Sequence, residues 1–86
     1  FAGQKQGNTL NGQYEIVSME GTFSQHGAHF HLSVSNEKGD VIGGHMLDGC
    51  LINTTAEVVI GILKDTKFDR VHDPETGFRE LLISKK

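Results

Sequence analysis

The sequence predicts one small domain made mainly of antiparallel β-strands. From Gln13 onward, runs rich in Val, Ile, Phe and Thr are broken by Gly and Asn/Asp clusters about every ten residues, which is typical of short strands joined by turns. Apolar residues do not recur at helical spacing in any longer window. The 86 residues suffice for one domain, and a domain of this size buries only about 60 to 65 % of its unfolded surface. We therefore expect it to be marginally stable when alone.

Residues 1–12 are glycine-rich and polar, which indicates a loop or arm in front of a domain over residues 13–86. Thr54–Leu63 could pass for a short buried helix on apolar content alone, but its β-branched residues favour a strand. Six strands are predicted: Gln13–Ser24, Ala28–Ser35, Asp40–Ile52, Thr55–Leu63, Lys67–His72 and Phe78–Ser84.

The turn between the second and third strands fixes their pairing. In Asn36-Glu37-Lys38-Gly39-Asp40, Gly39 supplies the positive φ of a three-residue loop, so Asn36 is predicted to pair with Asp40. The same register puts an apolar set on one face of the sheet and His31 opposite His45 on the other. A slip of one residue would scatter the apolar set, which supports this register independently. The apolar set is Phe30, Leu32, Val34, Ile42 and Met46.

Two further glycine-containing segments predict local structure. Asp73-Pro74-Glu75-Thr76-Gly77 has Pro at the second turn position and Gly at its end, which predicts a hairpin between the last two strands. The pair Gly43-Gly44 falls inside a predicted strand, where glycine usually marks a bulge or a close backbone approach.

Three histidines form the one set of residues with chemical character. His29 and His31 alternate along a strand and so share a face, and His45 is predicted to lie opposite His31. Three imidazoles around an open position suit Zn²⁺ or another divalent metal. The alternative is that all three form hydrogen bonds within a subunit interface or to water. Both interpretations stay open at this point.

The remaining polar candidates are predicted to be structural. His26 is expected in an exposed loop and His72 at a strand end. Cys50 has no basic neighbour in sequence that would favour a thiolate, so it is expected to be a buried, small apolar residue. Carboxylates that could orient an imidazole, but that more often form surface pairs, are Glu20, Asp48 and Glu57.

Charge and cysteine content narrow the function classes. The net charge is −3 and the basic residues are scattered, whereas nucleic-acid surfaces need clustered cations, so direct DNA binding by this segment is disfavoured. The single cysteine cannot form an internal disulfide, which predicts a reducing, cytoplasmic location. No apolar window is long enough to cross a membrane.

Several segments together resemble the plants-and-prokaryotes-conserved (PPC) domain, found in bacterial and archaeal proteins described as DNA-binding and in plant AT-hook nuclear proteins. They are Gly12–Ser18, His29–His31, Gly43–His45, Thr55–Val59 and Asp73–Phe78. The resemblance implies an α+β fold around an antiparallel sheet and a homotrimer. A family motif that supports contacts with transcription factors is similar to Gly12–Val17, with Gln13 and Tyr14 in place of Arg and Phe. It therefore implies protein partners.

The chain also departs from this family. The family domain begins with a further strand, helix and strand, and the chain has no counterpart, so residues 13–86 resemble its C-terminal two-thirds. We therefore expect additional material to complete the domain.

The basic DNA-binding hook of the plant proteins is absent from the sequence. The leading hypothesis is a trimeric interaction or regulatory module, associated with DNA-binding proteins by resemblance. The alternative is a metal-dependent enzyme acting on a small molecule.

Overall fold

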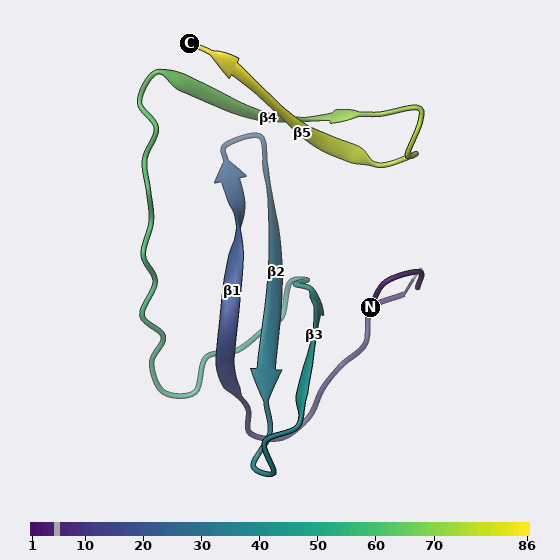
Figure 1. Cartoon of the computed structure of the whole chain (residues 1–86), viewed down its shortest axis with the longest axis vertical. Coiled ribbons are helices and arrows are strands. Elements are labelled where there is room, and N and C mark those ends of the chain that lie inside the picture. Colours follow the sequence, from purple (N-terminus) through teal and green to yellow (C-terminus); the bar gives the residue numbers. More distant parts are fainter. Residues whose placement is uncertain (5) are drawn as a thin grey trace. The chain divides into compact units, whose positions relative to one another are not determined.

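The computed structural model describes residues 1–4 and 6–86, which form five strands and no helix (Figure 1). The strands are β1 (Glu15–Ser24), β2 (Gly27–Ser35), β3 (Val41–His45), β4 (Thr66–His72) and β5 (Arg79–Lys85). They form a three-stranded sheet in the order β1-β2-β3 and a two-stranded sheet of β4 and β5. The chain divides into two compact units, residues 1–21 with 29–51 and residues 22–28 with 52–86.

In the first unit, β2 and β3 pair antiparallel in the predicted register. His31 pairs with His45, Leu32 with Gly44 and Val34 with Ile42. Beyond the end of β3, the Met46 N–H donates to the Phe30 carbonyl over 2.9 Å, which continues the same pairing. The predicted register is confirmed.

The turn that sets this register is held by the Asn36 side chain. Gly39 adopts a φ of 85°, and its N–H donates to the Asn36 carbonyl over 3.0 Å. The Asn36 N–H donates to the Asp40 carbonyl, while Asn36 Oδ1 accepts from the N–H groups of Lys38 and Asp40, each over 3.0 Å. Asparagine favours such turns because its short side chain can bond backbone groups two residues on.

The predicted close approach in the glycine pair occurs at Gly43. A Cβ placed there would lie 2.7 Å from the Leu32 carbonyl oxygen and 3.0 Å from the Ser33 Cβ. At Gly44 a Cβ would meet only Phe1, at 3.5 Å or more. The two neighbouring glycines therefore have different roles, and only Gly43 is sterically required.

In the second unit, β4 and β5 form an antiparallel hairpin from Thr66 paired with Lys85 to His72 paired with Arg79. The predicted turn closes it: Gly77 has a φ of 79° and donates to the Asp73 carbonyl over 2.8 Å. The Asp73 N–H donates to the Phe78 carbonyl over 2.8 Å, so this prediction is also confirmed.

Two predicted strands differ from the structure. The third ends at His45 rather than Ile52, since residues 46–52 form no ladder beyond the single hydrogen bond between Met46 and Phe30. Thr55–Leu63 is neither strand nor helix; Figure 1 draws it as a long trace without an arrow. The physical reason is that a strand is defined by a hydrogen-bonded neighbour, and no described segment supplies one.

None of the described side chains is fully buried. The predicted apolar face, which consists of Phe30, Leu32, Val34, Ile42 and Met46, is only half-buried. The helix implied by an α+β fold is not found among the described residues. None of these residues forms a helix long and apolar enough to span a membrane.

Candidate metal centre

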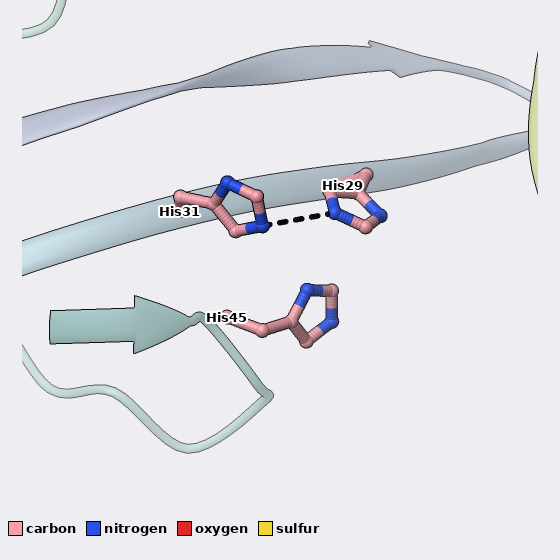
Figure 2. A group of neighbouring side chains, drawn as sticks. All are labelled: His29, His31 and His45. Carbon is pink, nitrogen blue, oxygen red and sulfur yellow. Dashed lines mark hydrogen bonds between the residues drawn. The ribbon is translucent and has the colours of Figure 1, made fainter. Parts of the chain in front are cut away.

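The three predicted histidines converge on one face of the first unit's sheet. His29 and His31 project from the same side of β2 because strand residues alternate, and His45 projects from the end of β3 towards them (Figure 2). His29 is half-buried, whereas His31 and His45 are exposed. The placement follows from the Asn36–Asp40 turn, since that turn fixes the partners across β2 and β3.

The imidazole rings lie close together at steep angles. Ring centroids are 4.9 Å apart for His29 and His31, 4.5 Å for His29 and His45, and 6.0 Å for His31 and His45. The rings meet edge to face, at interplanar angles of 69° to 77°. One nitrogen from each ring lies within 4.8 Å of the other two. Three potential ligand atoms therefore surround one point.

These separations can be compared with a zinc site. With Zn–N distances of about 2.0–2.1 Å and tetrahedral angles, ligand nitrogens lie about 3.3 Å apart. The Nε2 atoms of His29 and His31 are 3.2 Å apart and share a hydrogen bond, drawn as a dashed line in Figure 2. This pair already has the spacing of two ligands. The wider pairs, at up to 4.8 Å, would close by rotation of exposed side chains.

Small hydroxyl groups lie on the sheet near the histidines. Ser33 follows His31 by two residues on β2, so both share a face, and its Oγ lies 2.6 Å from the Ser18 Oγ of β1. Continuing this antiparallel pairing by two residues brings Glu20 opposite His31. Ser18 was not among the predicted residues. The sequence feature that could have identified Ser18 is the tight turn at Gln25-His26. The register that this turn sets between β1 and β2 pairs Ser18 with Ser33.

The other sequence candidates lie outside this cluster. His26 is in the turn between β1 and β2 as predicted, although it is half-buried; its N–H donates to Ser24 Oγ over 3.1 Å. His72 is the exposed last residue of β4, also as predicted. The metal-ligand group found among the described residues does not include Glu20, Asp48 or Glu57, all of which are exposed.

The prediction for Cys50 is wrong. Cys50 is exposed, and its Sγ lies 3.4 Å from the Leu47 carbonyl oxygen in the loop after β3. The prediction was based on the lack of a basic neighbour in sequence, and it placed Cys50 in a third strand that continued to Ile52. Since β3 ends at His45, nothing in the described part of the chain covers the thiol.

Comparison with known proteins places the chain in a family. Residues 2–64 match the Plants and Prokaryotes Conserved (PCC) domain, the family that the sequence segments resemble. The chain is 40 % identical over 85 residues to "Bifunctional protein GlmU" of Synechococcus sp. (strain JA-3-3Ab), and 40 % identical over 83 residues to the protein of that name from strain JA-2-3B'a(2-13). It spans only 14 % and 13 % of the lengths of these relatives.

A solved structure has the same fold. It is a hypothetical protein from Salmonella cholerae-suis, which is 42 % identical and superposes with a TM-score of 0.96 over all of this chain. This chain covers 62 % of the Salmonella chain. Since the family match extends over most of the 86 residues and includes all three histidines, the chain belongs to the Plants and Prokaryotes Conserved domain family.

Proposed function

We propose that this chain is a self-associating module that binds a divalent metal ion, Zn²⁺, through His29, His31 and His45. The observation that carries the proposal is that one nitrogen from each imidazole lies within 4.8 Å of the other two on an open sheet face. Neutral imidazoles favour zinc and similar transition metals, whereas Mg²⁺ and Ca²⁺ prefer oxygen ligands.

Three protein ligands would leave a fourth position on the ion. In zinc proteins that position is held by water or by a bound ligand, whereas purely structural sites use four protein ligands. His31 and His45 are exposed, so the fourth position would face solvent or a partner. Glu20, which the strand pairing brings opposite His31, is the carboxylate that we propose to accept a hydrogen bond from a ligand imidazole.

Self-association is supported by the amount of exposed apolar surface. Single apolar side chains are common on protein surfaces, but contiguous sets mark interaction sites. Here large apolar side chains are exposed on four of the five strands, and no side chain among the described residues is fully buried. We propose a homotrimer, in keeping with the family resemblance. The exposed apolar strand residues are Ile16, Val17 and Phe23 of β1, Val41 of β3, Val71 of β4, and Leu81, Leu82 and Ile83 of β5.

The same proposal extends to the missing helix, the cellular location and the mode of regulation. The helix of the α+β fold would lie in polypeptide outside these residues. The single, exposed Cys50 fits a reducing compartment, so we propose a cytoplasmic location. A net charge of −3 argues against direct DNA contact by this segment, so a regulatory role would operate through protein partners.

Equilibrium sedimentation with and without Zn²⁺ tests the proposal. We expect the mass of a trimer at micromolar concentration. A monomer in both conditions would overturn the self-association. A trimer in both conditions, with Zn²⁺ co-sedimenting in an amount equal to the chain concentration, would support both parts. A trimer that carries no Zn²⁺ would overturn the metal site alone.

A further inference from the structure

The β4–β5 hairpin gathers basic residues that are scattered in the sequence. Four of the chain's eight Lys and Arg residues lie where β4 begins and β5 ends, beside the C-terminal label in Figure 1. The ladder brings them together because Thr66 pairs with Lys85, and the Lys86 N–H donates to the Asp65 carbonyl over 3.1 Å. Positive charge is therefore concentrated at one end of a hairpin, in a chain whose net charge is −3. The four residues are Lys64, Lys67, Lys85 and Lys86.

The two faces of this ladder carry different lysines. Directly paired residues share a face, and successive residues of a strand alternate between faces. Lys67 pairs with Ser84, so Lys67 and Lys86 lie on one face, whereas Lys85 lies on the other. Lys67 and Lys86 both line a hollow of about 380 Å³, together with residues 24–26, Thr66 and Phe68. A volume of this size lies within the range of sites for small molecules.

The turn between β1 and β2 supplies the rest of the lining, and Ser24 holds it against β4. The Ser24 Oγ donates to the Phe68 carbonyl over 2.8 Å and accepts from the His26 N–H over 3.1 Å. The Gln25 side-chain amide nitrogen lies 3.2 Å from His26 Nε2. Since an amide nitrogen only donates, Nε2 accepts this bond, and Nδ1 carries the proton of the neutral ring. All of these residues belong to the second unit.

The polar groups of the lining favour an anion. Two ammonium groups, an imidazole N–H and the Thr66 hydroxyl can donate hydrogen bonds, and no Asp or Glu of the described residues lines the hollow. Charged donors of this kind form strong hydrogen bonds with phosphate oxygens. Nucleic-acid binding instead accumulates over about six to ten phosphates along a chain, which one end of a short hairpin does not span. The arrangement therefore suits a single phosphate group.

We propose that Lys67, Lys86 and His26 form a binding site for the phosphate group of a small phosphorylated molecule. The ammonium groups balance the charge of the phosphate, and His26 Nδ1–H and the Thr66 hydroxyl donate hydrogen bonds to its oxygens. The proposal concerns the second unit alone. It goes beyond the proposed function and depends on neither the metal nor the trimer.

Titration of the full, zinc-free polypeptide with inorganic pyrophosphate, followed by amide NMR chemical shifts, tests the site. Removing zinc prevents phosphate from binding to an ion at the histidine cluster. We expect saturable shift changes at residues 24–26 and 66–68 that sodium chloride at equal ionic strength does not reproduce. The absence of saturable changes up to about 10 mM pyrophosphate, or equal changes with sodium chloride, would overturn the proposal. Duplex DNA that produced the same changes at lower phosphate concentration would also overturn it, because the ligand would then be a polymer.

Lysine variants with the same change in net charge separate this site from general attraction of anions. Lys67→Gln and Lys86→Gln should each weaken pyrophosphate binding at least about threefold, since both side chains are exposed and contribute modestly. Lys85→Gln, on the other face, is the matched control and should leave the affinity unchanged. Equal weakening by all three would overturn the proposal.

A fourth variant should change the affinity in the opposite direction. Asp65 is exposed and shares the face of Lys67, although it does not line the hollow. Asp65→Asn removes a negative charge from that face and should strengthen pyrophosphate binding about twofold. This gain cannot come from a loss of folding. Unchanged or weaker binding would contradict the placement of the phosphate on this face.

Discussion

The β2–β3 hairpin and the segment Thr55–Leu63 have similar strand-forming compositions, but only the hairpin forms strands. In β2 apolar and polar residues alternate, and the Asn36–Asp40 turn brings β3 directly alongside β2. Thr55–Leu63 is apolar without alternation, and no described segment pairs with it. The hairpin therefore has a local source for its hydrogen bonds, whereas the segment does not.

This difference shows that a strand-forming composition alone does not make a segment a strand. β-branched residues favour a pleated, partly covered surface, so their preference is realised only where a neighbouring strand and a covering layer exist. The hairpin supplies its own neighbour over a short loop, which also places the histidines. Predictions about the hairpin should therefore hold for these 86 residues.

Acidification should release the metal. Only neutral imidazole binds Zn²⁺, and a free imidazole has a pKa of about 6.5, so protonation competes with the metal below that pH. With three imidazole ligands competing with protons, the affinity should fall by more than about tenfold as the pH is lowered from about 7.5 to about 5.5. Competition titration against a zinc indicator measures this change. A pH-independent affinity would show that the imidazoles are not the ligands.

Gly43→Ala should destabilise the hairpin, whereas Gly44→Ala should not. The new Cβ at Gly43 would lie 2.7 Å from the Leu32 carbonyl oxygen, and neither backbone can move without breaking the ladder. We expect a loss of about 1–3 kcal/mol in the free energy of unfolding, the usual range for overpacking. Urea unfolding monitored by circular dichroism gives the value. Equal stabilities of the two variants would contradict the close approach that separates them.

Gly39→Val tests the turn that fixes the register. Gly39 has a φ of 85°, at which a β-branched residue is strained by about 1–2 kcal/mol. Asparagine tolerates this region far better, so Gly39→Asn is the matched control. Thermal unfolding should rank wild type first, Gly39→Asn second and Gly39→Val last. A Gly39→Val protein as stable as wild type would show that the turn does not control the pairing.

Cys50→Ser should change the stability least. Cys50 is exposed and lies in the loop after β3, and surface substitutions away from special features usually stay within about 0.5 kcal/mol. Urea unfolding of the variant should coincide with that of wild type. A loss of more than about 1 kcal/mol would show that the thiol is covered in the folded protein.

The parts of the fold that were predictable from sequence are those with local causes. Gly39 and Gly77 mark turns by their need for positive φ, and the turns fix the pairing of β2 with β3 and of β4 with β5. The convergence of His29, His31 and His45 followed from the first of these registers alone. When two strands are joined by a short turn, the turn and the alternation of side chains together determine which residues share a face of the sheet.

The predictions that were wrong depended on distant neighbours. Thr55–Leu63 was predicted to be a strand because of its β-branched residues, and Cys50 to be buried because it has no basic neighbour in sequence. Neither a ladder nor burial follows from composition, since both require a second segment whose position the local sequence does not specify. Ser18 was missed for a different reason. The turn between β1 and β2 was recognised, but the pairing of β1 residues with β2 residues was not worked out from it.

Zinc content decides the central claim, that the hairpin places three imidazoles around one ion. Protein purified without an affinity-tag metal would be loaded with Zn²⁺ at neutral pH, dialysed and assayed by elemental analysis together with His31→Ala and His72→Ala. His72, exposed at the end of β4 and outside the cluster, is the matched control. We predict one Zn²⁺ per chain in wild type and in His72→Ala, and a strong loss in His31→Ala. No retained Zn²⁺ in wild type, or equal content in all three proteins, would contradict the claim.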